Sequence, residues 1–103
     1  GYLFIKVDRQ YRRLELADIL YLESCGNYVK VWTGPEFLLT TRTLHSLAAE
    51  LPIDDFLKIH KSFVVQKSKV DYLEGNQLVM KNGQPLPVGK MQRDVVATWV
   101  KGG

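Results

Sequence analysis

Short apolar runs, separated by residues that favour turns, make up most of this chain. Runs of this length that are rich in β-branched and aromatic residues predict strands. The predicted strands cover residues 2–7, 12–16, 18–23, 28–33, 36–41, 57–59, 63–65, 69–74, 77–81 and 86–88. Between two of them, Asn82-Gly83 is the strongest two-residue hairpin signal in the chain.

One short helix is predicted from apolar residues at helical spacing. They fall at positions i, i+3, i+4 and i+7 and are Leu44, Leu47, Ala48 and Leu51. Thr43 suits the N-cap of this helix, and Pro52 stops it. A predicted strand follows, where a helix-turn-helix motif would need a second helix, so the pattern argues against that motif.

A second helical segment is predicted near the end of the chain, over residues 89–100. Met91, Val95 and Trp99 fall at helical spacing within it. The predicted fold class is therefore mainly β, with one or two short α-helices.

Size and composition narrow the class of protein. With 103 residues, 46% of them hydrophobic, the chain has room for one domain with a modest core. No segment resembles a signal peptide or approaches the roughly 20 apolar residues of a membrane helix. The single cysteine, Cys25, excludes an internal disulfide and has no zinc-ligand spacing. We predict a cytoplasmic protein without a metal, a cofactor or a membrane contact.

Enzymatic chemistry finds little support in the sequence. His45 and His60 lie far apart, and no carboxylate pair, glycine-rich phosphate loop or nucleophile motif accompanies them. A small hydrolase would require a pocket that joins His60 to Asp71 or Glu74. A histidine that orders a turn by hydrogen bonding is the simpler interpretation of His60, so we predict that the chain is not an enzyme.

Positive charge gathers in the C-terminal half of the sequence. Residues 56–93 hold seven basic and two acidic residues, a net charge of +5, while all other residues together carry −2. Lys61 lies there in a polar bend between two apolar runs. We therefore predict one cationic region that presents donors to an anionic partner, and nucleic acid is the partner we predict. The alternative is a protein-interaction module that docks an acidic protein.

Three predicted turns carry side chains that can recognise bases. Asn27 lies in the first of them, Lys61 in the second, and Lys90 follows a break at residues 87–89. Lysine and asparagine can hydrogen-bond to base edges in the major groove, while backbone amides and other lysines hold phosphates. Three such turns on one edge would form a loop-based reader of duplex DNA. Spacing in the sequence does not show whether the three turns lie on the same edge of the molecule.

Aromatic side chains offer a second way to bind nucleic acid, by stacking on bases. In the strands of a small β domain such residues more often belong to the core. We predict a core position for Tyr21, Trp32, Phe37, Phe63 and Tyr72. Tyr28, beside the first turn, is the exception.

Several sequence blocks occur in a fixed order along nearly the whole chain. They are DILYLES at residues 18–24, GNYV at 26–29, TRTL at 41–44, LP at 51–52, Phe56, His60, SFVV at 62–65 and LPVGK at 86–90. In these blocks the chain resembles the LytTR DNA-binding domain, the output module of bacterial response regulators of the LytR and AgrA kind. Their number and order make the resemblance far more specific than any single motif.

The resemblance implies both a fold and a way of binding DNA. The fold is elongated and consists mainly of antiparallel strands with a short helix. Members of the family insert loops into successive major grooves, commonly bend the DNA and occupy paired direct repeats. Carried over by position, the base-contacting residues are Asn27, Tyr28, Lys61 and Lys90. The phosphate-contacting residues are Arg42, His60, Ser62, Lys67, Lys69 and Arg93.

Two positions depart from the family pattern. Members often carry Asn where this chain has Gln66, which still offers an amide on a longer stem. They often carry Ser-Arg where it has Gly89-Lys90, and lysine lacks the two-pronged match of arginine to guanine. The DNA consensus of the family therefore does not transfer to this chain.

The resemblance also implies a setting. We expect residues 1–103 to be one LytTR-type domain cut from a longer response regulator, with a receiver domain upstream and a cognate sensor kinase. The isolated domain is expected to be a monomer that binds weakly and to dimerise on DNA. The predicted function is sequence-specific binding of promoter DNA in transcription regulation.

Overall fold

The computed structural model describes residues 1–102. Its strands are β1 (Tyr2–Val7), β2 (Gln10–Glu15), β3 (Tyr21–Cys25), β4 (Tyr28–Trp32), β5 (Phe37–Thr40), β6 (Phe56–His60), β7 (Phe63–Gln66), β8 (Val70–Glu74), β9 (Gln77–Met80) and β10 (Pro85–Pro87). Its α-helices are α1 (Leu44–Ala48) and α2 (Arg93–Val100). Short 3₁₀ turns occupy η1 (Leu16–Asp18), η2 (Lys67–Lys69) and η3 (Lys90–Gln92).

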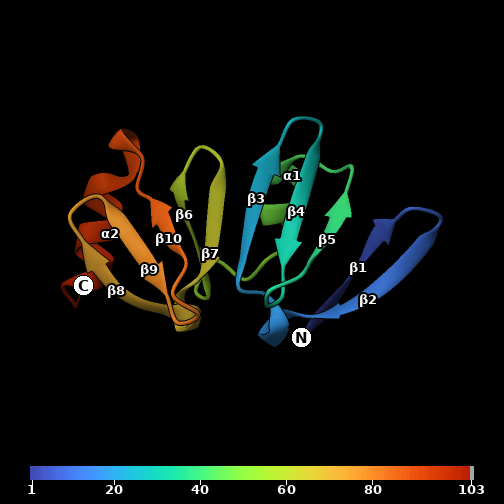
Figure 1. Cartoon of the computed structure of the whole chain (residues 1–103), viewed down its shortest axis with the longest axis horizontal. Coiled ribbons are helices and arrows are strands. Elements are labelled where there is room, and N and C mark those ends of the chain that lie inside the picture. The colour runs from blue at the N-terminus through green and yellow to red at the C-terminus, as the bar shows by residue number, and fades with distance from the viewer. Residues whose placement is uncertain (103) are drawn as a thin grey trace.

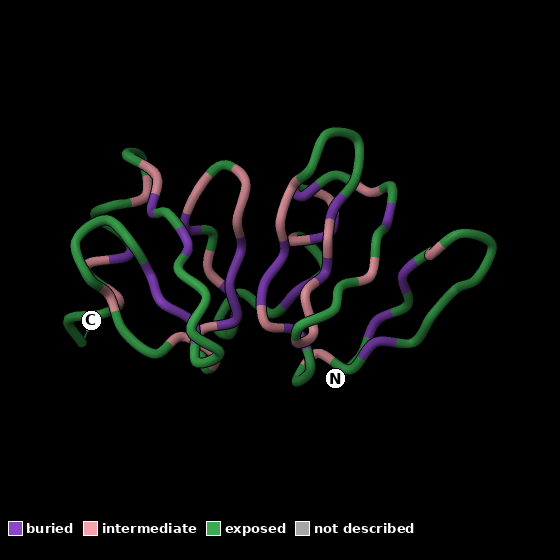
Figure 2. The backbone as a smooth tube through the Cα atoms, viewed as in Figure 1, coloured by how far each residue is buried: buried purple, intermediate pink, exposed green. Residues whose placement is uncertain are grey.

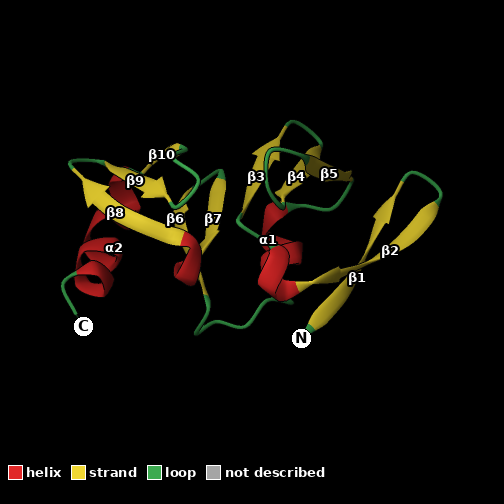
Figure 3. Ribbon diagram, turned by 60° about the horizontal axis from the view of Figure 1, so that its bottom comes forward, coloured by secondary structure: helices red, strands yellow, loops and turns green. Residues whose placement is uncertain are grey.

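The strands form three antiparallel sheets that follow one another along the molecule (Figures 1 and 3). A β1–β2 hairpin lies at one end, a five-stranded sheet in the order β5-β4-β3-β7-β6 in the middle, and a three-stranded β10-β9-β8 sheet at the other end. The molecule measures 41 × 25 × 23 Å. The predicted fold class, an elongated and mainly antiparallel β structure with two short helices, is confirmed.

The central sheet is buried on both faces. Successive side chains of a strand point to opposite faces, so Tyr21 and Leu22 of β3 belong to different cores. Leu22 lies opposite Val31 of β4 and Val64 of β7, and all three pack in the first core. Purple segments accordingly concentrate along the central strands in Figure 2.

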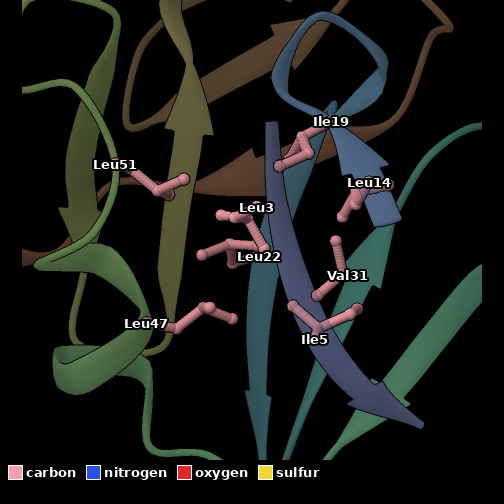
Figure 4. Close-up of a pocket in the computed structure, with 8 residues that line it drawn as sticks. All are labelled: Leu3, Ile5, Leu14, Ile19, Leu22, Val31, Leu47 and Leu51. Carbon is pink, nitrogen blue, oxygen red and sulfur yellow. The ribbon is translucent and has the colours of Figure 1, made fainter. Parts of the chain in front are cut away.

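Each face of the central sheet has its own cover. The β1–β2 hairpin and α1 cover one face through side chains that include Leu3, Ile5 and Leu47 (Figure 4). The space between these side chains has no volume accessible to a water molecule, so this site is packed core and not a ligand cavity. The β8–β10 sheet and α2 cover the other face, with Leu78, Met80 and Val96 buried against it.

Two predicted strands begin too early, each at the last residue of a 3₁₀ turn. The expected strands at 18–23 and 69–74 start inside η1 and η2, where the amide of Ile19 donates to the Leu16 carbonyl and that of Val70 to the Lys67 carbonyl. Each turn leads the chain from one sheet into the next. Alternation of apolar residues does not report such a turn, because a three-residue 3₁₀ segment hardly disturbs the pattern.

The C-terminal helix buries a different face from the one its spacing indicated. Val96 is buried and Trp99 packs beside it, whereas Val95 is exposed and Met91 is 88% exposed. The predicted helix over 89–100 is in fact η3 followed by α2. Because a 3₁₀ turn has 3.0 residues per turn and not 3.6, Met91 on η3 is out of phase with α2. Within α2 itself, Val96 and Trp99, three residues apart, form the face that packs on the second core.

The aromatic predictions are confirmed in part. Tyr21 is buried and stacks on Trp32, while Phe63 packs against the same core. Burial, with a smaller contribution from Glu23, raises the pKa of Tyr21. Phe37 and Tyr72 are exposed, contrary to the prediction. Both lie on the outermost strands of their sheets, β5 and β8, so a strand pattern overestimates how much is covered there.

Gln66 is a structural residue and its amide is not free for DNA. Its side chain is buried, and Nε2 donates to the carbonyl oxygens of Leu16 (3.0 Å) and Ile19 (2.6 Å). These bonds tie the end of β7 to η1, which connects the hairpin to the central sheet.

We predict that Gln66→Ala lowers the free energy of unfolding by about 2 kcal/mol, because it removes two hydrogen bonds and leaves buried carbonyls with fewer donors. Urea unfolding followed by circular dichroism measures this. Gln77→Ala, at an exposed glutamine at the start of β9, is the matched control and should change stability by less than about 0.5 kcal/mol. Equal midpoints for Gln66→Ala and the control would contradict the assignment.

Candidate nucleic-acid interface

Three turns lie along one long edge of the molecule, the upper edge in Figure 1. They are the β3–β4 turn, the β6–β7 turn and the segment from the end of β10 into η3. Asn27, Lys61 and Lys90 occur in these three segments, one in each, and all three are exposed. The tertiary structure therefore brings together the three turns whose convergence the sequence left open.

Backbone contacts hold the three segments together. The Ser24 amide, near the end of β3, donates to the Ser62 carbonyl in the β6–β7 turn at 2.9 Å. The Gly89 amide, just before η3, donates to the Ile59 carbonyl of β6 at 2.8 Å. Each bond joins one of these segments to a neighbouring one through residues that are buried or half-buried, so the backbone fixes the relative positions of the segments that carry the three exposed side chains.

Gly89 permits the close approach of η3 to β6. A Cβ atom at this position would lie 3.3 Å from the Cα atom of His60 and would also collide with the side chain of Gln92. The backbone amide of Gln92 donates to the Gly89 carbonyl at 2.9 Å, and this bond closes the turn. Lys90 is therefore carried by a segment packed directly against the strand that leads to Lys61.

The β3–β4 turn is tight because Gly26 adopts a φ of +59°, a conformation that costs glycine little. Tyr28 begins β4 opposite Cys25, with its ring half-exposed. Asn27 and Tyr28 line a groove of about 370 Å³ whose other wall includes Arg42 and Thr43. The turn thus presents an amide and an aromatic ring side by side.

His60 orders the β6–β7 turn, as the simpler interpretation of it predicted. Its Nδ1 atom accepts a hydrogen bond from the Ser62 amide at 3.0 Å, and its ring packs against Phe63. Because Nδ1 accepts, the ring proton sits on Nε2, and Nε2 is the imidazole atom left to donate to a phosphate. Lys61 stands exposed at the tip of this turn.

Arg42 already has protein partners. Its guanidinium forms an ion pair with Glu50 and donates to the Ser46 carbonyl at 2.9 Å, across the short helix α1. Thr43 caps the same helix, its Oγ1 accepting from the Ser46 amide at 3.0 Å, as the sequence predicted. A phosphate at Arg42 would have to share the charge with Glu50, so its contact with DNA stays a prediction.

Lys67 and Lys69 lie away from the three turns. Both belong to η2, at the opposite end of β7 from Lys61 and on the lower edge in Figure 1. The Lys67 ammonium lies 5.9 Å from the centre of the Trp99 ring, and the Lys81 amide donates to the Lys69 carbonyl. The prediction of one cationic region is wrong in this respect, because Lys61 and Lys67 are close in sequence but lie at opposite ends of the strand β7.

Arg93, at the start of α2, follows η3 directly and is exposed, so it lies close to the edge that bears Lys90. Met91, between Lys90 and Gln92, was assigned only to a helical pattern and not to the site. It belongs to η3, directly after Lys90, and is almost completely exposed. A large apolar residue directly after Lys90 and two residues before Arg93 was the available clue.

Within residues 1–102, the helices are all too short to cross a membrane. In the same part of the chain, no group of three or more His, Cys, Asp or Glu side chains is arranged to hold a metal ion.

Several bacterial proteins are similar in sequence to this chain. The chain is 32% identical over 65 residues to the transcriptional regulatory protein NatR of Bacillus subtilis, covering 63% of this chain and 28% of that protein. It is 28% identical to the sensory transduction protein LytT of B. subtilis, over 75% of this chain and 34% of LytT. It is 31% identical to the CO-responsive transcriptional regulator RcoM of Rhodospirillum rubrum, over 77% of this chain and 36% of RcoM. The chain thus spans about a third of the length of these relatives.

A solved LytTr DNA-binding domain from Bacillus cereus has the same fold, with a TM-score of 0.83 and 20% sequence identity over 99% of this chain and 97% of that one. The family profile of the LytTr DNA-binding domain matches residues 4–101, and therefore all of the strands and helices except the first two residues of β1. The chain belongs to the LytTr DNA-binding domain family.

Proposed function

We propose that this domain binds duplex DNA sequence-specifically by inserting its turns into successive major grooves, as the output domain of a bacterial response regulator. The observation that carries the proposal is the presence of Asn27, Lys61 and Lys90 on three turns of one edge. Their amide and ammonium groups are suited to base edges, and Tyr28 adds an aromatic ring beside the first turn.

The dimensions of the domain support contacts in more than one groove. One turn of B-DNA is about 34–36 Å long, and the long axis of the domain is 41 Å. The three turns are arranged along this axis. The β1–β2 hairpin occupies one end of this axis, so it is the domain as a whole, hairpin included, that can follow the DNA over about one helical turn.

The likeness to longer regulators supports a role in transcription. NatR and RcoM are described as transcriptional regulators, and LytT as a sensory transduction protein. We propose that the natural protein also contains a receiver domain addressed by a sensor kinase in the cytoplasm. In this proposal the isolated domain is a monomer, and two copies meet on paired direct repeats.

Selection from a pool of random duplex DNA at near-physiological salt tests the proposal. Enrichment of a short motif, alone or as direct repeats, is the expected result. Binding without any enriched motif, together with comparable affinity for acidic polypeptides, would overturn sequence-specific recognition and favour a basic module that docks an acidic protein.

We predict a steep salt dependence for the specific complex. If about six phosphates are contacted, log affinity should fall with log salt at a slope of about −5, because each contact releases condensed counterions. Fluorescence anisotropy between about 50 and 300 mM salt measures the slope. Arg93→Ala should reduce its magnitude by about 1.

The placement of η2 supplies the matched control for this measurement. Lys69→Ala removes the same charge on the opposite edge and should leave the slope unchanged. A larger effect of Lys69→Ala than of Arg93→Ala would show that DNA lies along the other edge.

A further inference from the structure

Met91 is the most exposed large apolar side chain among the described residues, at 88%, and it belongs to η3, one of the three segments on the edge proposed to bind DNA. Burial of a methionine side chain is favourable, and the domain does not use Met91 for its core. The side chain lies next to Lys90 and two residues before Arg93.

The backbone around Met91 is held firmly. Gly89, two residues earlier, is bonded to Ile59 of β6, and the Gln92 amide closes the turn onto the Gly89 carbonyl. Val96, less than two turns later in α2, is fully buried in the second core. The thioether is therefore presented from a rigid segment and keeps its own rotational freedom.

The charges beside Met91 limit the kind of ligand that its side chain can contact. Lys90 and Arg93 are both exposed and positively charged, so they draw a polyanion to this segment. In the major groove of a polyanionic duplex, the apolar feature on the base edges is the C5-methyl group of thymine, and apolar side chains contact it directly. We propose that Met91 reads the methyl group of a thymine next to the base pair contacted by Lys90, an inference that rests on the proposed DNA-binding function.

The methyl group can be removed from the DNA without touching its hydrogen-bonding pattern, which gives a direct test. Each thymine of the selected site is replaced in turn by deoxyuridine, and the affinity of the wild-type domain is measured by fluorescence anisotropy. We expect one position at which the loss of the methyl group weakens binding by about three- to ten-fold. Met91→Ala should bind the unmodified site about as weakly as the wild type binds that modified site, and should be insensitive to the replacement there.

Two variants separate this effect from a general loss of apolar surface. Met91→Leu keeps an apolar side chain of similar size and should retain sensitivity to the same methyl group. Ile53→Ala removes an equally exposed apolar side chain, 85% exposed, in the segment before β6 and away from the three turns. It should behave as the wild type on every site.

The outcomes distinguish failure of this inference from failure of the proposed function. If the domain selects a motif but the wild type and Met91→Ala respond equally to deoxyuridine at every position, the inference is overturned and the proposed function stands. A selected motif without a thymine that matters to the wild type has the same meaning. If no motif is selected at all, both the inference about Met91 and the proposed sequence-specific DNA binding are overturned.

Discussion

Replacing Lys61 by alanine is expected to weaken binding to the selected DNA site by about five- to 150-fold, which corresponds to about 1–3 kcal/mol. The ammonium group stands at the exposed tip of the β6–β7 turn, on an edge whose backbone is fixed by bonds to the neighbouring turns. A base contact made from such a turn is lost with the side chain, and neighbouring lysines cannot replace it.

The comparison with random DNA decides what kind of contact Lys61 makes. A base contact predicts a loss on the selected site that clearly exceeds the loss on random duplex. A phosphate contact predicts equal losses on both. Lys81→Ala is the charge-matched control, because Lys81 lies at the far edge, bonded to the η2 segment, and should affect neither DNA.

Lys90→Ala extends the test to the third turn. We expect a similar loss, and the double variant tests coupling between the two lysines. Since Gly89 packs directly on His60, the two turns share a backbone contact and their effects need not add. Full additivity would show that each turn reads its base independently.

Replacing Leu22 by alanine is expected to lower the free energy of unfolding by about 2–5 kcal/mol, a large part of the 5–15 kcal/mol that is common for domains. Leu22 is fully buried on β3, the middle strand of the central sheet, and lies among the side chains of the first core (Figure 4). The packing there leaves no room for water, so truncation opens a cavity that its neighbours fill only in part.

Urea unfolding measures this loss, and Leu39→Ala provides the control. Leu39 lies on β5, the edge strand of the same sheet, and is 39% exposed, so the same truncation should cost clearly less. At a temperature where Leu22→Ala is still folded, its affinity for DNA should equal that of the wild type. Equal losses of stability for the two variants would contradict the position of Leu22 at the centre of the core.

Most of the strands could be predicted because local sequence determines them. Apolar runs bounded by turn residues identified the ten strands, and Thr43 marked the start of the first helix, which ends at Ala48, before the predicted stop at Pro52. The misplaced strand starts lie at 3₁₀ turns, which connect successive sheets and do not interrupt the alternation of apolar residues. The misassigned face of α2 has a different origin, because Val95 and Val96 are adjacent apolar residues and only packing against the second core selects Val96.

In the candidate site, too, some features follow from local sequence and others depend on the tertiary structure. Turn chemistry and the resemblance to the LytTR family were enough to single out Asn27, Lys61 and Lys90, because a turn is a local property of a few residues. The pairing of Arg42 with Glu50 was not visible, since it depends on how α1 brings the residues before and after it together. The burial of the Gln66 amide was not visible either, since its acceptor carbonyls lie some fifty residues away in the chain.

By itself, then, the sequence determined which segments are strands, which residues lie in exposed turns and to which family the chain belongs. Only the tertiary structure decided which of the positive charges share an edge. The +5 segment is divided because antiparallel strands carry its residues to opposite ends of the sheets, with Lys61 and Lys90 at one edge and Lys67 and Lys69 at the other. Charge along a chain is a one-dimensional property, whereas a surface for DNA depends on strand direction and register, which are set by packing between distant residues.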